Sequence, residues 1–156
     1  MDLIEAGIRK IFNKRIKIYV LLFRASRDGF GAENFHSKCD NKRYTVTLVK
    51  TKEGRRFGGF TDAVWDQSFY NKRGSNCFIF SIDNNEIYYN KDSNYNIFCN
   101  KNSGPTFGNN DFSISNDCNK NNKSREYSND SFDTYGKEFL WQELIIFMLM
   151  IMKYIK

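Results

Sequence analysis

The chain has 156 residues, a length that one domain with a sizeable core accounts for most simply. Its fifteen phenylalanines and nine tyrosines favour strands over helices, and its single proline excludes collagen-like and proline-rich linker sequences. The formal net charge of +6 comes from dispersed lysines and arginines, which indicates a solvated basic surface; an acidic protein partner, nucleic acid or anionic lipid are the alternatives.

Cysteine usage and hydropathy indicate a cytoplasmic protein without a transmembrane segment. The four cysteines show no C-x-x-C spacing, and the start of the chain lacks the basic and apolar regions of a signal peptide, so we expect reduced thiols; the cysteines are Cys39, Cys77, Cys99 and Cys118. The apolar run over residues 144–152 would span only about 14 Å as a helix, too short for a hydrocarbon core of about 30 Å.

The first forty residues predict two helices around one strand. A stripe of apolar residues predicts a helix over residues 3–14, and the unbroken apolar run in residues 16–24 predicts a strand buried on both faces. Asp28-Gly29 indicates a turn, and Gly31 is an acceptable N-cap for a helix over residues 32–39. Its apolar face would carry four residues at helical spacing: Ala32, Phe35, His36 and Cys39.

The rest of the chain is mostly β in pattern. Strands are predicted over residues 44–50, 56–60, 77–82, 86–89, 95–99 and 112–114, with a hairpin turn at 52–55. Further expectations are a turn at residues 104–108, a polar Asn-rich loop over 117–133, a strand-like segment over 138–147 and an apolar extension over 148–156. The fold class is therefore α+β, mainly β: a sandwich of two antiparallel sheets flanked by a few short helices.

Residue chemistry points to no active site. His36 is the only histidine, and together with Cys39 it could supply half of a metal site or a nucleophile pair, but nothing in the sequence completes either arrangement. No P-loop is present, and Gly58-Gly59 is more typical of a bulge or of backbone packed against a neighbouring element. We therefore predict no catalytic residue, metal or cofactor; a weak peroxide scavenger centred on Cys39 is the alternative.

An ordered set of motifs gives the chain a family resemblance. The motifs are Arg27-Asp28-Gly29-Phe30 with Phe35-His36 and Cys39-Asp40, then residues 56–60 with Trp65, residues 77–82, and residues 104–108 with Asp111. This set resembles the TLDc domain, the module of the oxidation resistance proteins, over roughly residues 3–147. The resemblance implies a single domain over residues 1–147 built as a β-sandwich, with residues 148–156 lying beyond the family's end.

The resemblance also implies a function. Family members are associated with resistance to oxidative damage and with binding of the vacuolar proton-pumping ATPase. We accordingly expect a non-catalytic domain that binds a protein partner and not nucleic acid, in the cytoplasm or on vacuolar or endolysosomal membranes through that partner. A regulatory domain of a longer protein is an alternative.

The motif residues divide into two expected groups. The expected partner contacts are Arg27, Asp28, Gly29, Gly104, Pro105, Thr106, Phe107, Gly108, Asp111 and Glu143. The expected structural signature is Phe30, Phe35, His36, Cys39, Gly58, Gly59 and Trp65.

Overall fold

The computed structural model describes residues 3–13, 18–91, 94–126, 131–134 and 144–153. Its helices are α1 (Leu3–Phe12), α2 (Ala25–Asp28) and α3 (Ala32–Cys39). Its strands are β1 (Ile18–Arg24), β2 (Thr45–Thr51), β3 (Arg56–Thr61), β4 (Asn71–Lys72), β5 (Cys77–Ser81), β6 (Glu86–Tyr89), β7 (Ile97–Phe98), β8 (Ser103–Phe107), β9 (Phe112–Ser115), β10 (Arg125–Glu126) and β11 (Leu144–Lys153).

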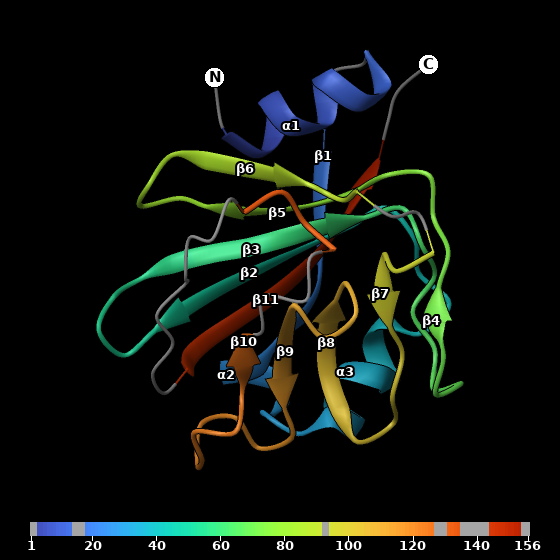
Figure 1. Ribbon diagram of the computed structural model, residues 1–156. Coiled ribbons are helices and arrows are strands. Elements are labelled where there is room, and N and C mark those ends of the chain that lie inside the picture. The colour runs from blue at the N-terminus through green and yellow to red at the C-terminus, as the bar shows by residue number, and fades with distance from the viewer. Residues whose placement is uncertain (1–2, 14–17, 92–93, 127–130, 135–143, 154–156) are drawn as a thin grey trace.

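These strands form two antiparallel sheets, which confirms the predicted sandwich. One sheet has six strands in the order β1-β11-β2-β3-β5-β6, and the other has five in the order β10-β9-β8-β7-β4. In Figure 1, α1 lies above the six-stranded sheet, while the five-stranded sheet and α3 lie below it. The six-stranded sheet is therefore covered on both faces, as expected where a sheet supplies the middle layer of a domain.

The central strands bury both faces because each face meets a different layer. Alternate residues of β3 and β5 divide between two apolar clusters: Phe57 and Ile79 join the cluster that contains the five-stranded sheet's Phe107, whereas Phe60 and Phe78 pack with the α1 residue Ile8. A strand with apolar neighbours on both sides needs no polar alternation. This explains why residues 77–80 of β5 form a continuous apolar run.

The expectation that residues 16–24 form a strand buried on both faces is wrong. β1 is the edge strand of its sheet, and only Phe23 is buried, while Ile18 and Leu21 are 49% and 39% exposed. An unbroken apolar run does not reveal a strand's position in a sheet, because that position depends on which distant segment pairs with it.

The later part of the chain also differs from expectation. Residues 104–108, predicted as a turn, lie largely in strand β8, and the predicted loop 117–133 contains β10 and the buried Phe132. The short strand β4 was not predicted. β11 begins at Leu144 and continues to Lys153, so it carries most of the segment expected as an extension, and the earlier part of the predicted strand 138–147 lies outside the described residues.

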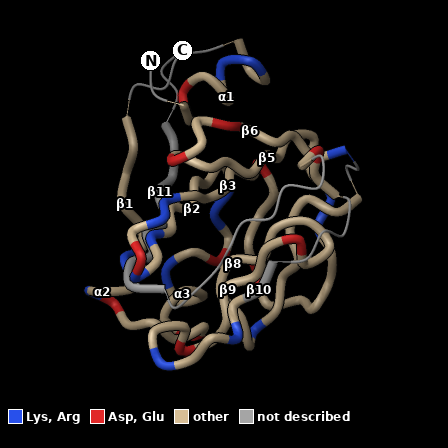
Figure 2. Tube along the Cα trace, turned by 60° about the vertical axis from the view of Figure 1, so that its left-hand side comes forward, with Lys and Arg blue, Asp and Glu red and all other residues tan. Residues whose placement is uncertain are grey.

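Charge is spread over the molecule. Figure 2 shows basic segments on α1, beside β2 and in the loops at the lower end, so positive charge is not confined to one face. Among the described helices, none has the length and apolar character needed to cross a membrane.

Candidate functional site

The exposed corner between β1 and α3 holds three of the expected contact residues. Arg27 extends into solvent with its side chain 53% exposed and forms a 2.7 Å ion pair with Asp28. Asp28 also binds the backbone of the preceding turn, because its Oδ2 accepts a hydrogen bond from the Arg24 N–H at 2.9 Å. The hydrogen bond from Arg27, together with that from Arg24, lowers the pKa of Asp28 to about 2, so the carboxylate is ionised at neutral pH.

Gly29 completes this corner by a backbone conformation that suits glycine. Its φ is +107°, and a Cβ there would lie 2.6 Å from Asn34 Oδ1. The same Asn34 oxygen accepts the Gly31 N–H at 3.0 Å, and Asn116 Oδ1 accepts the Ala32 N–H at 2.7 Å. The start of α3 is therefore fixed both locally and to the distant β9–β10 connection, which holds the corner in a defined position.

The structural signature residues converge between the two sheets. Phe35 on α3 packs edge-to-face on Trp65, with ring centroids 5.5 Å apart, and Trp65 packs likewise on Phe107 of β8 at 5.8 Å. Trp65 also donates a hydrogen bond from Nε1 to Thr45 Oγ1 at 2.7 Å, and Phe30 packs partly buried against the same cluster. Three motif blocks that lie far apart in the sequence thus form one aromatic core.

His36 links α3 to the β7–β8 connection. Its Nδ1 lies 2.7 Å from Asp40 Oδ1, and its Nε2 lies 2.9 Å from the carbonyl oxygen of Asn100 and 3.2 Å from that of Ser103. Both ring nitrogens lie within hydrogen-bond distance of oxygen atoms on other residues, so the ring is held from both sides. The ring is also buried, and its contacts are those of a structural tie.

The cysteines are placed for packing. All four are buried and carry free thiols. Burial raises the pKa of the Cys39 and Cys77 thiols far above the usual range, and it raises the pKa of Cys99 to about 12 and that of Cys118 to about 11. Because the thiolate is the reactive species, a raised pKa lowers the reactive fraction of each thiol at neutral pH.

Gly58 and Gly59 lie where neighbouring elements approach β3 closely. A Cβ on Gly58 would lie 1.9 Å from the carbonyl oxygen of Thr47 on the paired strand, and one on Gly59 would lie 2.6 Å from the Phe107 ring of the opposite sheet. The absence of side chains at these two positions therefore permits both the strand pairing and the contact between sheets.

The second group of expected contact residues is mostly buried. Within the segment 104–108, the first four residues belong to β8 and are buried. Asp111 is also buried, and its Oδ1 accepts the Ser131 N–H at 3.0 Å. Burial raises the pKa of its carboxyl group, against the lowering effect of this hydrogen bond. Glu143 lies outside the described residues. Among the described members of the expected contact set, the exposed part is the corner at Arg27–Gly29.

Two cavities were not anticipated from the sequence. One, of about 580 Å³, is lined by Arg43, Asp62, Ala63, Val64, Lys72, Arg73, Gly74 and Ser75. The other, of about 650 Å³, is lined by Ala32, Glu33, His36, Ser37, Gln67, Lys101, Asn102 and Asn116. For the first cavity, the sequence offered one local signal, the adjacent cations Lys72-Arg73 after the aromatic pair Phe69-Tyr70. The sequence did not show that Arg43 lines the same cavity.

The described parts of the chain contain no group of three metal-ligating side chains of the His, Cys, Asp or Glu type. Among curated proteins, no sequence matches this chain. The family model of the TLDc domain matches residues 3–147. That match covers both sheets up to the first part of β11, and it includes the aromatic core, the glycine pair and the Arg27–Gly29 corner described above. The chain therefore belongs to the TLDc domain family.

Proposed function

We propose that this domain is a non-catalytic protein-interaction module that binds the vacuolar proton-pumping ATPase and contributes to protection against oxidative stress. The observation that carries the proposal is the family match over residues 3–147, because pump binding and oxidation resistance are associated with this family. The proposal places the domain in the cytoplasm, where it meets the soluble, ATP-hydrolysing sector of the pump.

Two features of the fold support binding in preference to catalysis. The nucleophile pair considered from the sequence is unsuited to chemistry, because Cys39 is buried with a raised pKa and His36 has acceptors at both ring nitrogens. Catalysis needs several groups positioned around a reacting atom, and this pair does not provide them.

The corner at Arg27 is the proposed contact with the pump. Its guanidinium is exposed, while the backbone beneath it is held by Asp28 and by the fixed start of α3. Recognition residues are commonly carried on such loops of a rigid scaffold. The buried residues of β8 do not contact the partner in this proposal. They contribute to the aromatic core that supports the corner.

The test is a pull-down of pump subunits from the source organism's lysate at low salt, with the purified domain as bait. We expect the wild-type domain to retain subunits of the soluble sector and Arg27→Glu to retain fewer, because charge-steered contacts are strongest at low ionic strength. Arg55→Glu is the matched control, because it reverses an exposed arginine that belongs to the β2–β3 turn and not to the Arg27–Gly29 corner.

Equal melting temperatures for the two variants and the wild type would show that the fold is unchanged. Failure of the folded wild-type domain to retain any pump subunit would overturn the proposed function. Equal losses in Arg27→Glu and Arg55→Glu would reject the corner as the contact while leaving pump binding in place.

A further inference from the structure

The end of the five-stranded sheet at β4 combines three features that the proposed pump contact does not use. β4 is the last strand in the order β10-β9-β8-β7-β4, and it lies at the right-hand margin of the molecule in Figure 1. Lys72, the last residue of β4, belongs to the lining of the cavity of about 580 Å³. Two exposed aromatic side chains, Phe69 and Tyr70, directly precede the strand and are 58% and 70% exposed.

The hydrogen bonds of β4 leave one edge open. The carbonyl oxygens of Tyr70 and Lys72 accept N–H groups from Cys99 and Asn96 on the β7 side, at 3.0 and 3.1 Å. In an antiparallel pair, bonded and non-bonded positions alternate, so the N–H and C=O of the intervening Asn71 are directed away from β7. Among the described strands, none pairs with β4 on that side. Such an edge is a template for an extended peptide.

The adjoining cavity is basic. Arg43 and Arg73 are exposed arginines in its lining, and Arg43 is held in place by a hydrogen bond from Nε to the Asp62 carbonyl oxygen at 3.3 Å and by its position over the Tyr44 ring. Lys72 adds a third cation, paired with Asp66 at 2.5 Å. Asp62, the carboxylate of the lining, is 5% exposed and accepts a hydrogen bond from Asn76. The accessible charge of the cavity is therefore carried by guanidinium groups, which match carboxylates well.

We propose that the open edge of β4 and the adjoining cavity bind an extended acidic peptide segment of a protein partner. Its backbone pairs with Asn71, a carboxylate binds Arg43 and Arg73, and an apolar side chain packs on Phe69 or Tyr70. The inference adds a second surface to the proposed function and does not depend on the pump being the partner.

Charge and geometry favour a peptide over a phosphate backbone at this place. A nucleic acid needs a track of cations along several phosphates. Here the three cations, Arg43, Lys72 and Arg73, gather in one cavity, which provides no such track. The open N–H and C=O of Asn71 match the alternating donors and acceptors of a peptide, and a phosphodiester chain provides no such donors.

The probe is a blocked hexapeptide of alternating Glu and Val, titrated into the ¹⁵N-labelled domain, with the Gln/Val hexapeptide as matched control. We expect chemical-shift changes concentrated at residues 62–64 and 69–75, slower hydrogen exchange of the Asn71 N–H, and weaker binding of the Gln/Val peptide. Arg73→Gln is expected to weaken binding of the acidic peptide about fivefold, the range for an exposed but well-aligned arginine–carboxylate pair.

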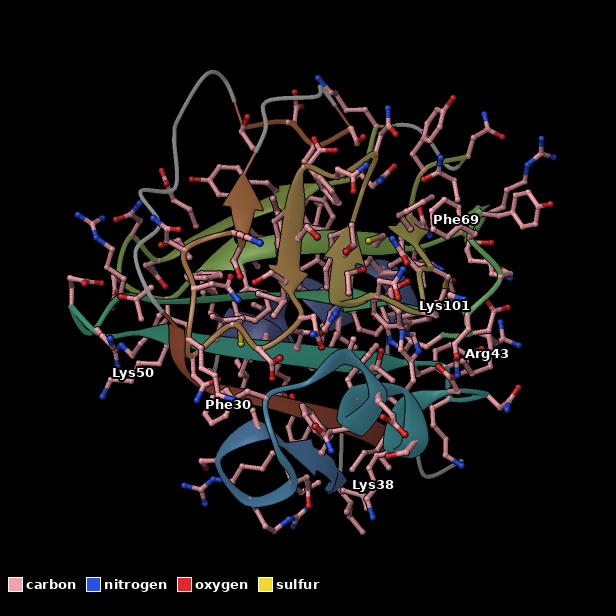
Figure 3. All side chains as sticks on the ribbon, turned by 90° about the horizontal axis from the view of Figure 1, so that it is seen from below. Phe30, Lys38, Arg43, Lys50, Phe69 and Lys101 are labelled. Atoms are coloured by element: carbon pink, nitrogen blue, oxygen red, sulfur yellow. The ribbon has the colours of Figure 1, made fainter. Side chains whose placement is uncertain are left out.

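Arg55→Gln is the matched control, because it removes the same group at the β2–β3 turn. Lys50, at that end of the hairpin, lies on the side of the molecule opposite Arg43 and Phe69 in Figure 3. The proposal is overturned by equal binding of the two peptides, by equal effects of Arg73→Gln and Arg55→Gln, or by shifts elsewhere on the surface. Displacement of the acidic peptide by inorganic phosphate or by hexathymidylate at similar concentration would assign the cavity to phosphate groups instead.

Discussion

At the residue scale, the motif residues of this domain are fixed by side-chain volume and burial. Gly58 and Gly59 leave room for a neighbouring backbone and for an aromatic ring, and Cys39, the last residue of α3, is part of the buried apolar core. The one histidine is an anchor between α3 and the β7–β8 connection. The motif residues were recognisable in the sequence, but their roles depend on contacts with residues far along the chain.

Cys39 is expected to react slowly with a thiol reagent in the native state. Its side chain is fully buried and its pKa is strongly raised by desolvation, so little thiolate is present and the reagent has no access. Labelling followed by mass spectrometry, with and without denaturant, checks this expectation. Rapid native labelling with Cys39 ahead of the other three would revive the redox hypothesis.

Gly59→Val is expected to lower the free energy of unfolding by about 1–3 kcal/mol, because the added side chain overlaps the Phe107 ring. Gly58→Ala should cost more than an alanine at position 59, since it meets the Thr47 backbone oxygen, which cannot rotate away as a ring can. Denaturant titrations measure both effects.

Gly54→Asn is the control for these glycine substitutions, because nothing lies within 4 Å of a Cβ there and asparagine tolerates positive φ better than most residues. Its loss of stability should be smaller than that of either β3 variant. Unchanged stability of Gly59→Val together with lost partner binding would assign Gly59 to a contact surface.

At the scale of elements, β11 brings the C-terminal part of the chain into one sheet with the N-terminal strand β1. It pairs with β1 on one side and β2 on the other, and its residues 148–153 make all of the register pairs with β1. The family match ends at residue 147, inside this strand. The boundary of the matched region is therefore not a boundary of the folded sheet.

A chain that ends at Phe147 is expected to lose cooperative unfolding. Without residues 148–153, β1 has no strand partner among the described residues, and residues 45–48 of β2 lose their neighbour. Thermal melts followed by circular dichroism test this, and a chain that ends at Lys153 should melt like the complete sequence. A Phe147-terminated chain with an unchanged melting temperature would contradict the observed pairing.

At the scale of the whole molecule, stability depends on the layer of aromatic side chains between the sheets. Phe107 lies at its centre, in contact with Trp65 and with Phe112, whose ring centroid is 4.7 Å away. This layer joins the five-stranded sheet, α3 and the inner face of the six-stranded sheet into one core. The exposed surfaces proposed for binding are carried on the outside of this core.

Phe107→Ala is expected to lower the free energy of unfolding by about 3–5 kcal/mol through the cavity it leaves. Phe69→Ala is the matched control: its ring is 58% exposed and touches Phe98 at the surface, so a loss below about 1 kcal/mol is expected. Chemical denaturation of both variants tests the comparison. Equal losses would mean that the sheets are held together by contacts other than this aromatic layer.

The sequence alone determined the fold class, α3 and the hairpins, because these follow from local patterns. Turn residues separate β2 from β3 and β5 from β6, and the helical spacing of Ala32, Phe35, His36 and Cys39 specified the buried face of α3. The motif order was also sufficient to identify the family. These features depend on neighbours within about one helical turn or one hairpin, which a sequence displays directly.

Only the tertiary structure decided which strands lie at the edges, where β11 inserts and which cations share a cavity. β1 is as apolar as a central strand, and β8 contains the turn-like residues Gly104 and Pro105, so local composition pointed the wrong way in both. Arg43 and Arg73 line one cavity although they are thirty positions apart in the chain. Pairings between distant segments set all of these features, because burial and charge proximity arise only when the two sheets and their connections have packed together.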